Sequence, residues 1–254
     1  MVSSGVIPVW LAAGGWGLLA SSALVIGALL GWFIGFSSKS IAHVMAFGSG
    51  ILVAALAFEL VDEALEQAGI LWVAGGFMVG ALVFSLINHR LNSPGVRHRK
   101  RSHTQQPAAN NTGLAIAAGT LLDGIPESMA IGLLVAGGGK LSIATIAAIF
   151  ISNIPEALSS TAGMRRAGRN GWFMVQLWGA ITLLSGVFAV LGALFFGAAP
   201  PHIKALITCV AAGGIFAMVV ETMIPEAFAE THEMSGLMAA LGFVAALALQ
   251  ALER

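Results

Sequence analysis

The stretch LLDGIPESMAIG, residues 121–132, places a proline and two carboxylates inside a run of Ala, Ile, Leu, Val and Gly. Related phrases follow in ISNIPEALSS, residues 151–160, and in VVETMIPEAFAE, residues 219–230. The dipeptide Pro-Glu therefore recurs in surroundings where a charged side chain is costly. The sequence around these motifs shows what kind of protein tolerates that cost.

The composition indicates an integral membrane protein. Of the 254 residues, 57% are hydrophobic and 9% are charged, whereas about a quarter of an ordinary soluble chain is charged. The mean hydropathy is +0.90. Because the formal net charge is zero, nothing in the overall charge favours a nucleic-acid partner, and we expect none. The single cysteine, Cys209, cannot form a disulfide within the chain.

Eight segments are apolar enough to cross a bilayer as helices, which requires roughly 20 residues each. The predicted spans are approximately 10–36, 41–62, 70–88, 113–137, 141–164, 172–198, 203–228 and 235–252. The chain is thus expected to be a single all-α transmembrane domain over residues 1–254. One connection is long, polar and basic, at about 89–112, and short connections join the other spans.

The distribution of basic residues predicts the orientation of the chain. Nine of the twelve Lys and Arg residues lie near the connections after spans one, three and five. Basic loops of membrane proteins remain in the cytoplasm. The long loop is therefore expected in the cytoplasm of a cell-membrane protein, with both termini outside.

Carboxylates inside the predicted spans require a specific environment. At the bilayer centre each ionised group costs at least ~2.5–3.5 kcal/mol on insertion scales, and the apolar windows contain no Lys or Arg to offset it except Lys204 at the start of the seventh span. These carboxylates must therefore be protonated, face water or bind a cation. The alternative is that interhelical hydrogen bonds alone hold them.

The spacing of polar residues favours a cation. Asp123 and Glu127 share a helix face, as do Ser152 and Glu156, with Asn153 three residues before Glu156. Each proline also removes a backbone donor and frees the carbonyl one turn earlier. Carboxylate, amide, hydroxyl and carbonyl oxygens are suitable ligands for divalent metals.

The ends of two spans resemble each other and suggest an internal repeat. FELVDEALEQAG closes the second span and VETMIPEAFAETHEMSG closes the seventh. With spans four and five also similar, this predicts a 3+2+3 inverted-repeat arrangement, which is typical of secondary transporters. A further hypothesis places an exit relay at His232 with Glu226, Glu230 and Glu233.

The chain resembles the ZIP family of divalent-metal transporters over nearly its whole length. The likeness rests on eight spans, a long loop after the third, and Pro-Glu motifs in the fourth and fifth. The family pattern His-Asn-x-Pro-Glu-Gly reads DGIPES here, residues 123–128, and the next motif reads SNIPE, residues 152–156.

The resemblance implies the identity of the metal ligands. Asp123, Glu127, Ser152 and Glu156 would form the main metal site, and Glu127, Asn153 and Glu156 would remain from a neighbouring second site. Gly124 replaces a ligand of that second site, and residues 172–198 contain no carboxylate.

The sequence thus predicts a carrier, not an enzyme, that moves divalent cations such as zinc, iron or manganese toward the cytoplasm. The metal is its transported substrate, and no organic cofactor is expected. The protein would act in the lipid bilayer alone or as a homodimer. Two alternatives remain: an intramembrane metal-dependent hydrolase with Glu127 or Glu156 as base, and a proton-linked carrier of an organic solute.

Overall fold

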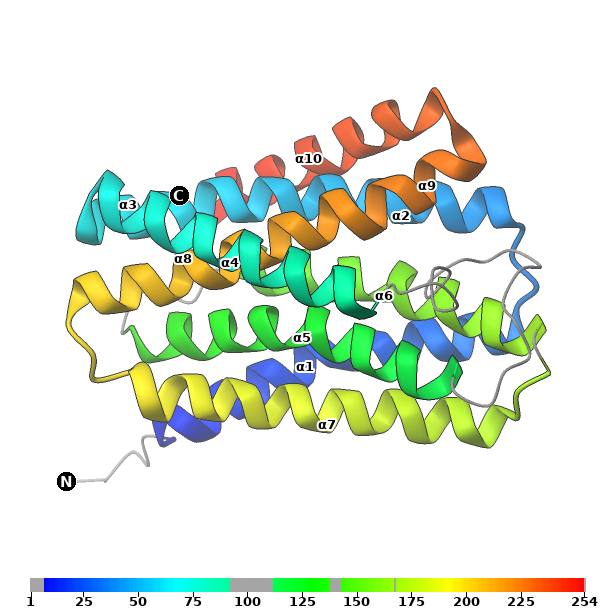
Figure 1. Ribbon diagram of the computed structural model, residues 1–254, viewed down its shortest axis with the longest axis horizontal. Coiled ribbons are helices and arrows are strands. Elements are labelled where there is room, and N and C mark those ends of the chain that lie inside the picture. The colour runs from blue at the N-terminus through cyan, green and yellow to red at the C-terminus, as the bar shows by residue number, and fades with distance from the viewer. Residues whose placement is uncertain (1–6, 92–111, 138–142, 167, 254) are drawn as a thin grey trace.

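The fold consists of helices throughout the part of the chain that the computed structural model describes (Figure 1). That part comprises residues 7–91, 112–137, 143–166 and 168–253, without the side chains of residues 91, 112–118, 120, 123 and 253. The elements are α1 (Val9–Phe33), α2 (Ser38–Ala55), η1 (Leu56–Val61), α3 (Asp62–Ala68), α4 (Ile70–Leu91), α5 (Thr112–Ala136), α6 (Ile143–Arg166), α7 (Gly171–Phe196), α8 (Pro201–Met218), η2 (Val219–Met223), α9 (Ile224–Thr231) and α10 (Met234–Glu253).

Seven helices in the described ranges are long and apolar enough to cross a membrane, which confirms the expectation of an all-α, multi-pass membrane protein. Within α5, the described residues provide a shorter apolar stretch, Gly124–Ala136. Most of the basic loop predicted at about 89–112 lies outside the described residues.

Local sequence signals set several helix ends. Ser37 caps α2 by accepting a hydrogen bond from the Ser40 backbone N–H at 3.0 Å. Asn170 caps α7 in the same way, through Trp172 N–H at 3.0 Å. Gly69 separates α3 from α4 with φ of 75°, a left-handed conformation that favours glycine.

The long helices run side by side, and α1 begins at the end of the bundle where α10 ends (Figure 1). They pack as two groups. In the first, α1 contacts α5, α6 and α7, and α5 also contacts α7. In the second, α4 packs on α8, and α2 packs on α10 and α9. The groups meet where α6 lies against α2 and where α5 lies against α8.

Two long helices share an irregularity that the sequence analysis did not predict. Ser38–Ala68 and Pro201–Thr231 each contain 31 residues. Each begins with an 18-residue α-helix that passes into a π-helical turn, η1 or η2, before a short acidic α-helix. In η2, the backbone N–H of Ile224, the residue before Pro225, donates to the carbonyl of Val219, five residues earlier. A π-turn widens the helix locally and can accommodate a proline ring.

Glycines allow two helix crossings that are built alike. A Cβ on Gly80 of α4 would lie 1.9 Å from the Val210 carbonyl oxygen, and one on Gly213 of α8 would lie 1.9 Å from the Phe77 oxygen. At the crossing of α2 and α10, a Cβ on Gly50 would lie 1.8 Å from the Ala239 carbonyl oxygen. A Cβ on Gly242 would lie 2.0 Å from the Phe47 carbonyl oxygen. Small residues at such crossings let backbones pack closely in a membrane.

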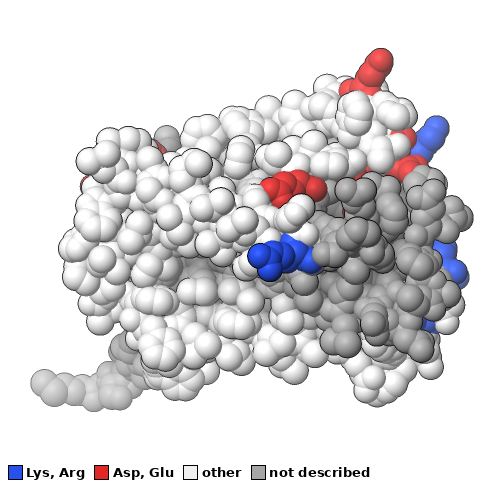
Figure 2. Space-filling view, in the orientation of Figure 1, with Lys and Arg blue, Asp and Glu red and all other residues white. Residues whose placement is uncertain are grey.

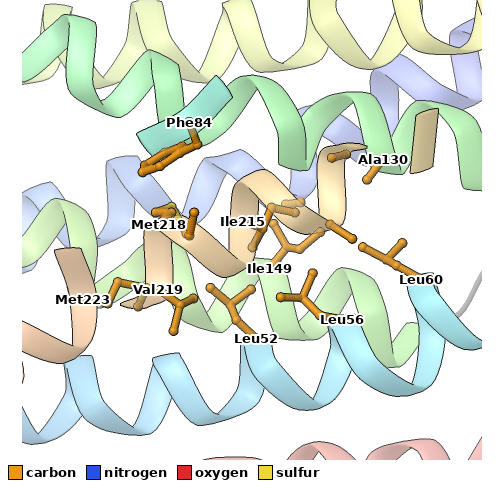
Figure 3. Close-up of a cluster of buried hydrophobic side chains, with 14 of the residues drawn as sticks. Leu52, Leu56, Leu60, Phe84, Ala130, Ile149, Ile215, Met218, Val219 and Met223 are labelled. Carbon is orange, nitrogen blue, oxygen red and sulfur yellow. The ribbon is translucent and has the colours of Figure 1, made fainter. Parts of the chain in front are cut away.

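The main hydrophobic core lies where the two groups meet (Figure 3). Leu52 and Leu56 from one long helix face Ile215 and Met218 from the other, and Ile149 of α6 approaches from the first group. The core therefore includes residues that flank all three Pro-Glu motifs in the sequence: Ala130 and Ile131, Ile149, and Met223 and Ala227.

Candidate functional site

Pro126 and Pro155 lie inside α5 and α6, so neither proline ends its helix. Both rings pack on the opposite group of helices. A Cβ added to Gly214 of α8 would lie 3.5 Å from Pro126 Cγ, and one on Gly48 of α2 would lie 3.3 Å from Pro155 Cγ. The two motifs therefore dock in matching ways on the two long helices.

The glutamates that follow these prolines are buried. Glu127 is 4% exposed and Glu156 is 3% exposed, although acidic side chains are almost never fully buried without compensation. Neither carboxylate faces open solvent in this conformation. Of the environments considered from the sequence, protonation, cation binding and interhelical hydrogen bonds remain compatible with this burial.

Two further predicted ligands line the interior beside Glu156. Ser152 is buried, and its hydroxyl donates to the Ile149 carbonyl at 2.9 Å, so its oxygen keeps lone-pair capacity. The buried Asn153 donates from Nδ2 to the Ala20 carbonyl of α1 at 3.3 Å, which orients its amide. Hydroxyl and amide oxygens are suitable for a hard divalent cation.

The fifth predicted ligand, Asp123, falls in α5, but its side chain lies outside the described residues. Among the residues that are described, no three His, Cys, Asp or Glu side chains gather closely enough to hold a metal. The structure thus places Glu127, Ser152, Asn153 and Glu156 in the buried interior and leaves the position of the Asp123 carboxylate as a prediction.

Two other carboxylates have polar partners that the sequence analysis missed. Ser85 of α4 donates to Glu221 Oε1, and Asn88 Nδ2 donates to Glu221 Oε2 at 2.7 Å. On α6, Ser159 donates to Glu226 Oε1. The sequence signal for the Glu221 contacts was the presence of Ser85 and Asn88, three residues apart, in an otherwise apolar span.

The proposed exit relay receives no support from the described geometry. His232 is exposed, ends α9 with φ of 44°, and stacks edge-on against Phe228 at 5.7 Å. With Glu226, Glu230 and Glu233 all among the described residues, no metal-holding cluster forms there.

No family model fits the sequence, and no curated protein is similar to it at a significant level. The resemblance to the ZIP family therefore depends on the motifs and span order described above.

Proposed function

We propose that the protein is a secondary carrier of divalent metal cations, with its substrate site between α5 and α6. The observation that carries this proposal is the pair of buried glutamates, Glu127 and Glu156, each directly after a proline inside an apolar helix. A desolvated cation compensates for buried negative charge, and carboxylate oxygens replace part of its hydration shell. Asp123, Ser152 and Asn153 would supply the remaining oxygens.

The repeated packing supports an inverted repeat of eight spans in a 3+2+3 arrangement. The crossing of Gly80 with Gly213 joins α4 to α8, the third and seventh long helices. The crossing of Gly50 with Gly242 joins α2 to α10, the second and eighth. In such a repeat, spans one, two and three correspond to spans six, seven and eight. The crossing of spans three and seven therefore corresponds to the crossing of spans eight and two. The same correspondence relates the two 31-residue helices with their π-turns.

The two groups of helices provide a basis for alternating access. The site helices α5 and α6 belong to one group and contact the other through α8 and α2. Relative movement of the groups would expose the site first to one side of the membrane and then to the other, as in other carriers built from inverted repeats.

The proposed orientation places the basic end of the bundle in the cytoplasm and both termini outside the cell. Arg165 and Arg166 end α6, Arg169 precedes α7, and Lys39 starts α2, all at the same end. Figure 2 shows a largely uncharged flank, with one blue group near the middle of the view and others at the right-hand end. Positive-inside bias thus supports a cytoplasmic basic end, and the proposed direction of transport across the cell membrane is uptake into the cytoplasm.

Reconstitution into proteoliposomes tests the proposal directly. Radioactive zinc, manganese or ferrous iron should accumulate in vesicles that contain the protein and not in empty vesicles. Lipid or peptide turnover without metal uptake would instead indicate a hydrolase, and proton-driven uptake of an organic solute would indicate the other alternative. Either result would overturn the proposal.

A further inference from the structure

A pocket of about 110 Å³ lies between α1 and α7, and its lining contains none of the predicted metal ligands. Its lining is apolar and comes from one face of each helix: Val25, Ala28, Leu29, Trp32, Phe33, Gly171, Met174, Val175 and Trp178. The pocket extends along α1 from Val25 to Phe33, which at 1.5 Å per residue is roughly 12 Å. Leu29 and Val175 are more than 40% exposed, so the pocket opens sideways from the bundle.

The inner wall of this pocket is held firmly. Trp178 is fully buried, and its indole Nε1 donates to Thr161 Oγ1 of α6 at 2.9 Å. Trp32 lies against Gly171, where a Cβ would approach the indole to 2.8 Å. A preformed apolar pocket binds a hydrophobic group without first having to open.

One end of the pocket is strongly basic. Arg165 donates from Nη1 to the Trp32 carbonyl at 2.5 Å, and its guanidinium lies 5.7 Å from the centroid of the Trp32 ring. Arg166 is exposed beside it, and the Arg169 guanidinium lies 5.7 Å from the Phe173 ring. Residues 157–220 contain no Asp or Glu, and neither does α1.

We infer that this pocket binds an anionic phospholipid. Part of one acyl chain would occupy the groove between α1 and α7, and Arg166 and Arg169 would bind the phosphate at the membrane surface. The combination of a lateral apolar groove with cationic groups at only one end matches an amphiphile with a negative headgroup. A zwitterionic lipid would gain less from the arginines, because its ammonium group offsets the charge of its phosphate, and a free phosphate would gain nothing from the groove.

A lipid in this pocket could influence the proposed transport site through α6. Arg165 and Arg166 end α6, and this helix also carries Ser152 and Glu156. A lipid that binds Arg166 would fix the end of the helix whose movement the carrier requires.

Native mass spectrometry of the full-length protein tests the site. Protein released from mixed micelles of phosphatidylglycerol and phosphatidylcholine should retain phosphatidylglycerol preferentially. The double variant Arg166→Gln/Arg169→Gln should lower that preference roughly 25-fold, because each basic side chain at an anionic surface contributes about fivefold. The matched control is Lys39→Gln, which removes an exposed charge at the same end of the bundle on α2.

A second pair of variants tests the groove with the arginines intact. Val175→Trp fills the opening of the pocket and should abolish lipid retention, whereas Leu183→Trp, on the exposed surface of α7 outside the pocket, should not. Equal retention of both lipids by the wild type would overturn the inference. Equal effects of the arginine and lysine variants would also overturn it, as would free phosphate binding as tightly as the lipid. A third contradicting result is that Val175→Trp changes the dimer content and leaves the lipid content unchanged.

Discussion

Ser159 on α6 donates a hydrogen bond to Glu226 on α9, which connects the helix that carries Glu156 to the long helix of the opposite group. Ser159 is one turn beyond Glu156, and Glu226 follows the π-turn that precedes α9. The bond therefore crosses the contact surface along which the two groups of helices would move during transport.

Loss of this bond should destabilise the observed conformation. Ser159→Ala is expected to lower the free energy of unfolding by about 1–2 kcal/mol, because the Glu226 carboxylate loses a donor. Thermal unfolding in detergent measures the change. The control is Ser160→Ala, which removes an equally buried hydroxyl that has no hydrogen-bond partner among the described residues. If the two variants have equal stability, the bond contributes nothing.

The glycine crossing of α4 with α8 makes a prediction with an internal control on the same helix. Gly80→Ala should destabilise the protein by about 1–3 kcal/mol, because its methyl group would overlap the Val210 carbonyl. Gly75→Ala meets open space and should be neutral or stabilising, since alanine favours helix by up to ~1 kcal/mol. Comparison of the two melting temperatures checks this, and a stable Gly80→Ala protein would disagree with the described packing.

The proposed orientation predicts which positions an external reagent reaches. The only native cysteine, Cys209, is fully buried, so introduced cysteines can be read without interference. Glu66 and Glu233 are both exposed, in α3 and in the turn after α9. A membrane-impermeant maleimide should label Glu66→Cys in intact cells and reach Glu233→Cys only after the membrane is permeabilised. The reverse pattern would place the basic end outside.

Asp123 should influence the choice of metal. Imidazole favours zinc, whereas carboxylate favours manganese, so Asp123→His should raise zinc uptake relative to manganese. A difference of ~1–2 kcal/mol corresponds to several-fold to tenfold or more, since 1.4 kcal/mol is tenfold. Competition uptake with both metals measures this ratio. An unchanged ratio with intact transport would mean that Asp123 does not contact the metal.

Sequence patterns predicted the class and position of the helices well. The apolar runs are long, and Gly, Pro and polar residues interrupt them, so the expected spans agree with the helices to within a few residues except at one end. The second span was predicted to end at about residue 62, whereas its helix continues to Ala68. Acidic residues at this end lowered the local hydropathy, although the chain continues as helix through the π-turn.

The partners of individual carboxylates were harder to predict. Ser85 and Asn88 are 136 and 133 residues away from Glu221, and Ser159 is 67 residues away from Glu226. Such pairs depend on which helices become neighbours, and helical periodicity alone does not specify that. The burial of Glu127 and Glu156 was easier to predict, because each follows a proline near the middle of an apolar run.

Metal uptake by glutamine variants of the buried glutamates tests the central claim most directly. Glu127→Gln and Glu156→Gln preserve shape and remove the charge, and both proteins should fold because a buried charge is lost. In proteoliposomes both should lose zinc and manganese uptake, whereas Glu66→Gln, a matched change at an exposed site, should transport normally. Wild-type uptake by Glu127→Gln at low and saturating metal would contradict a metal site between α5 and α6.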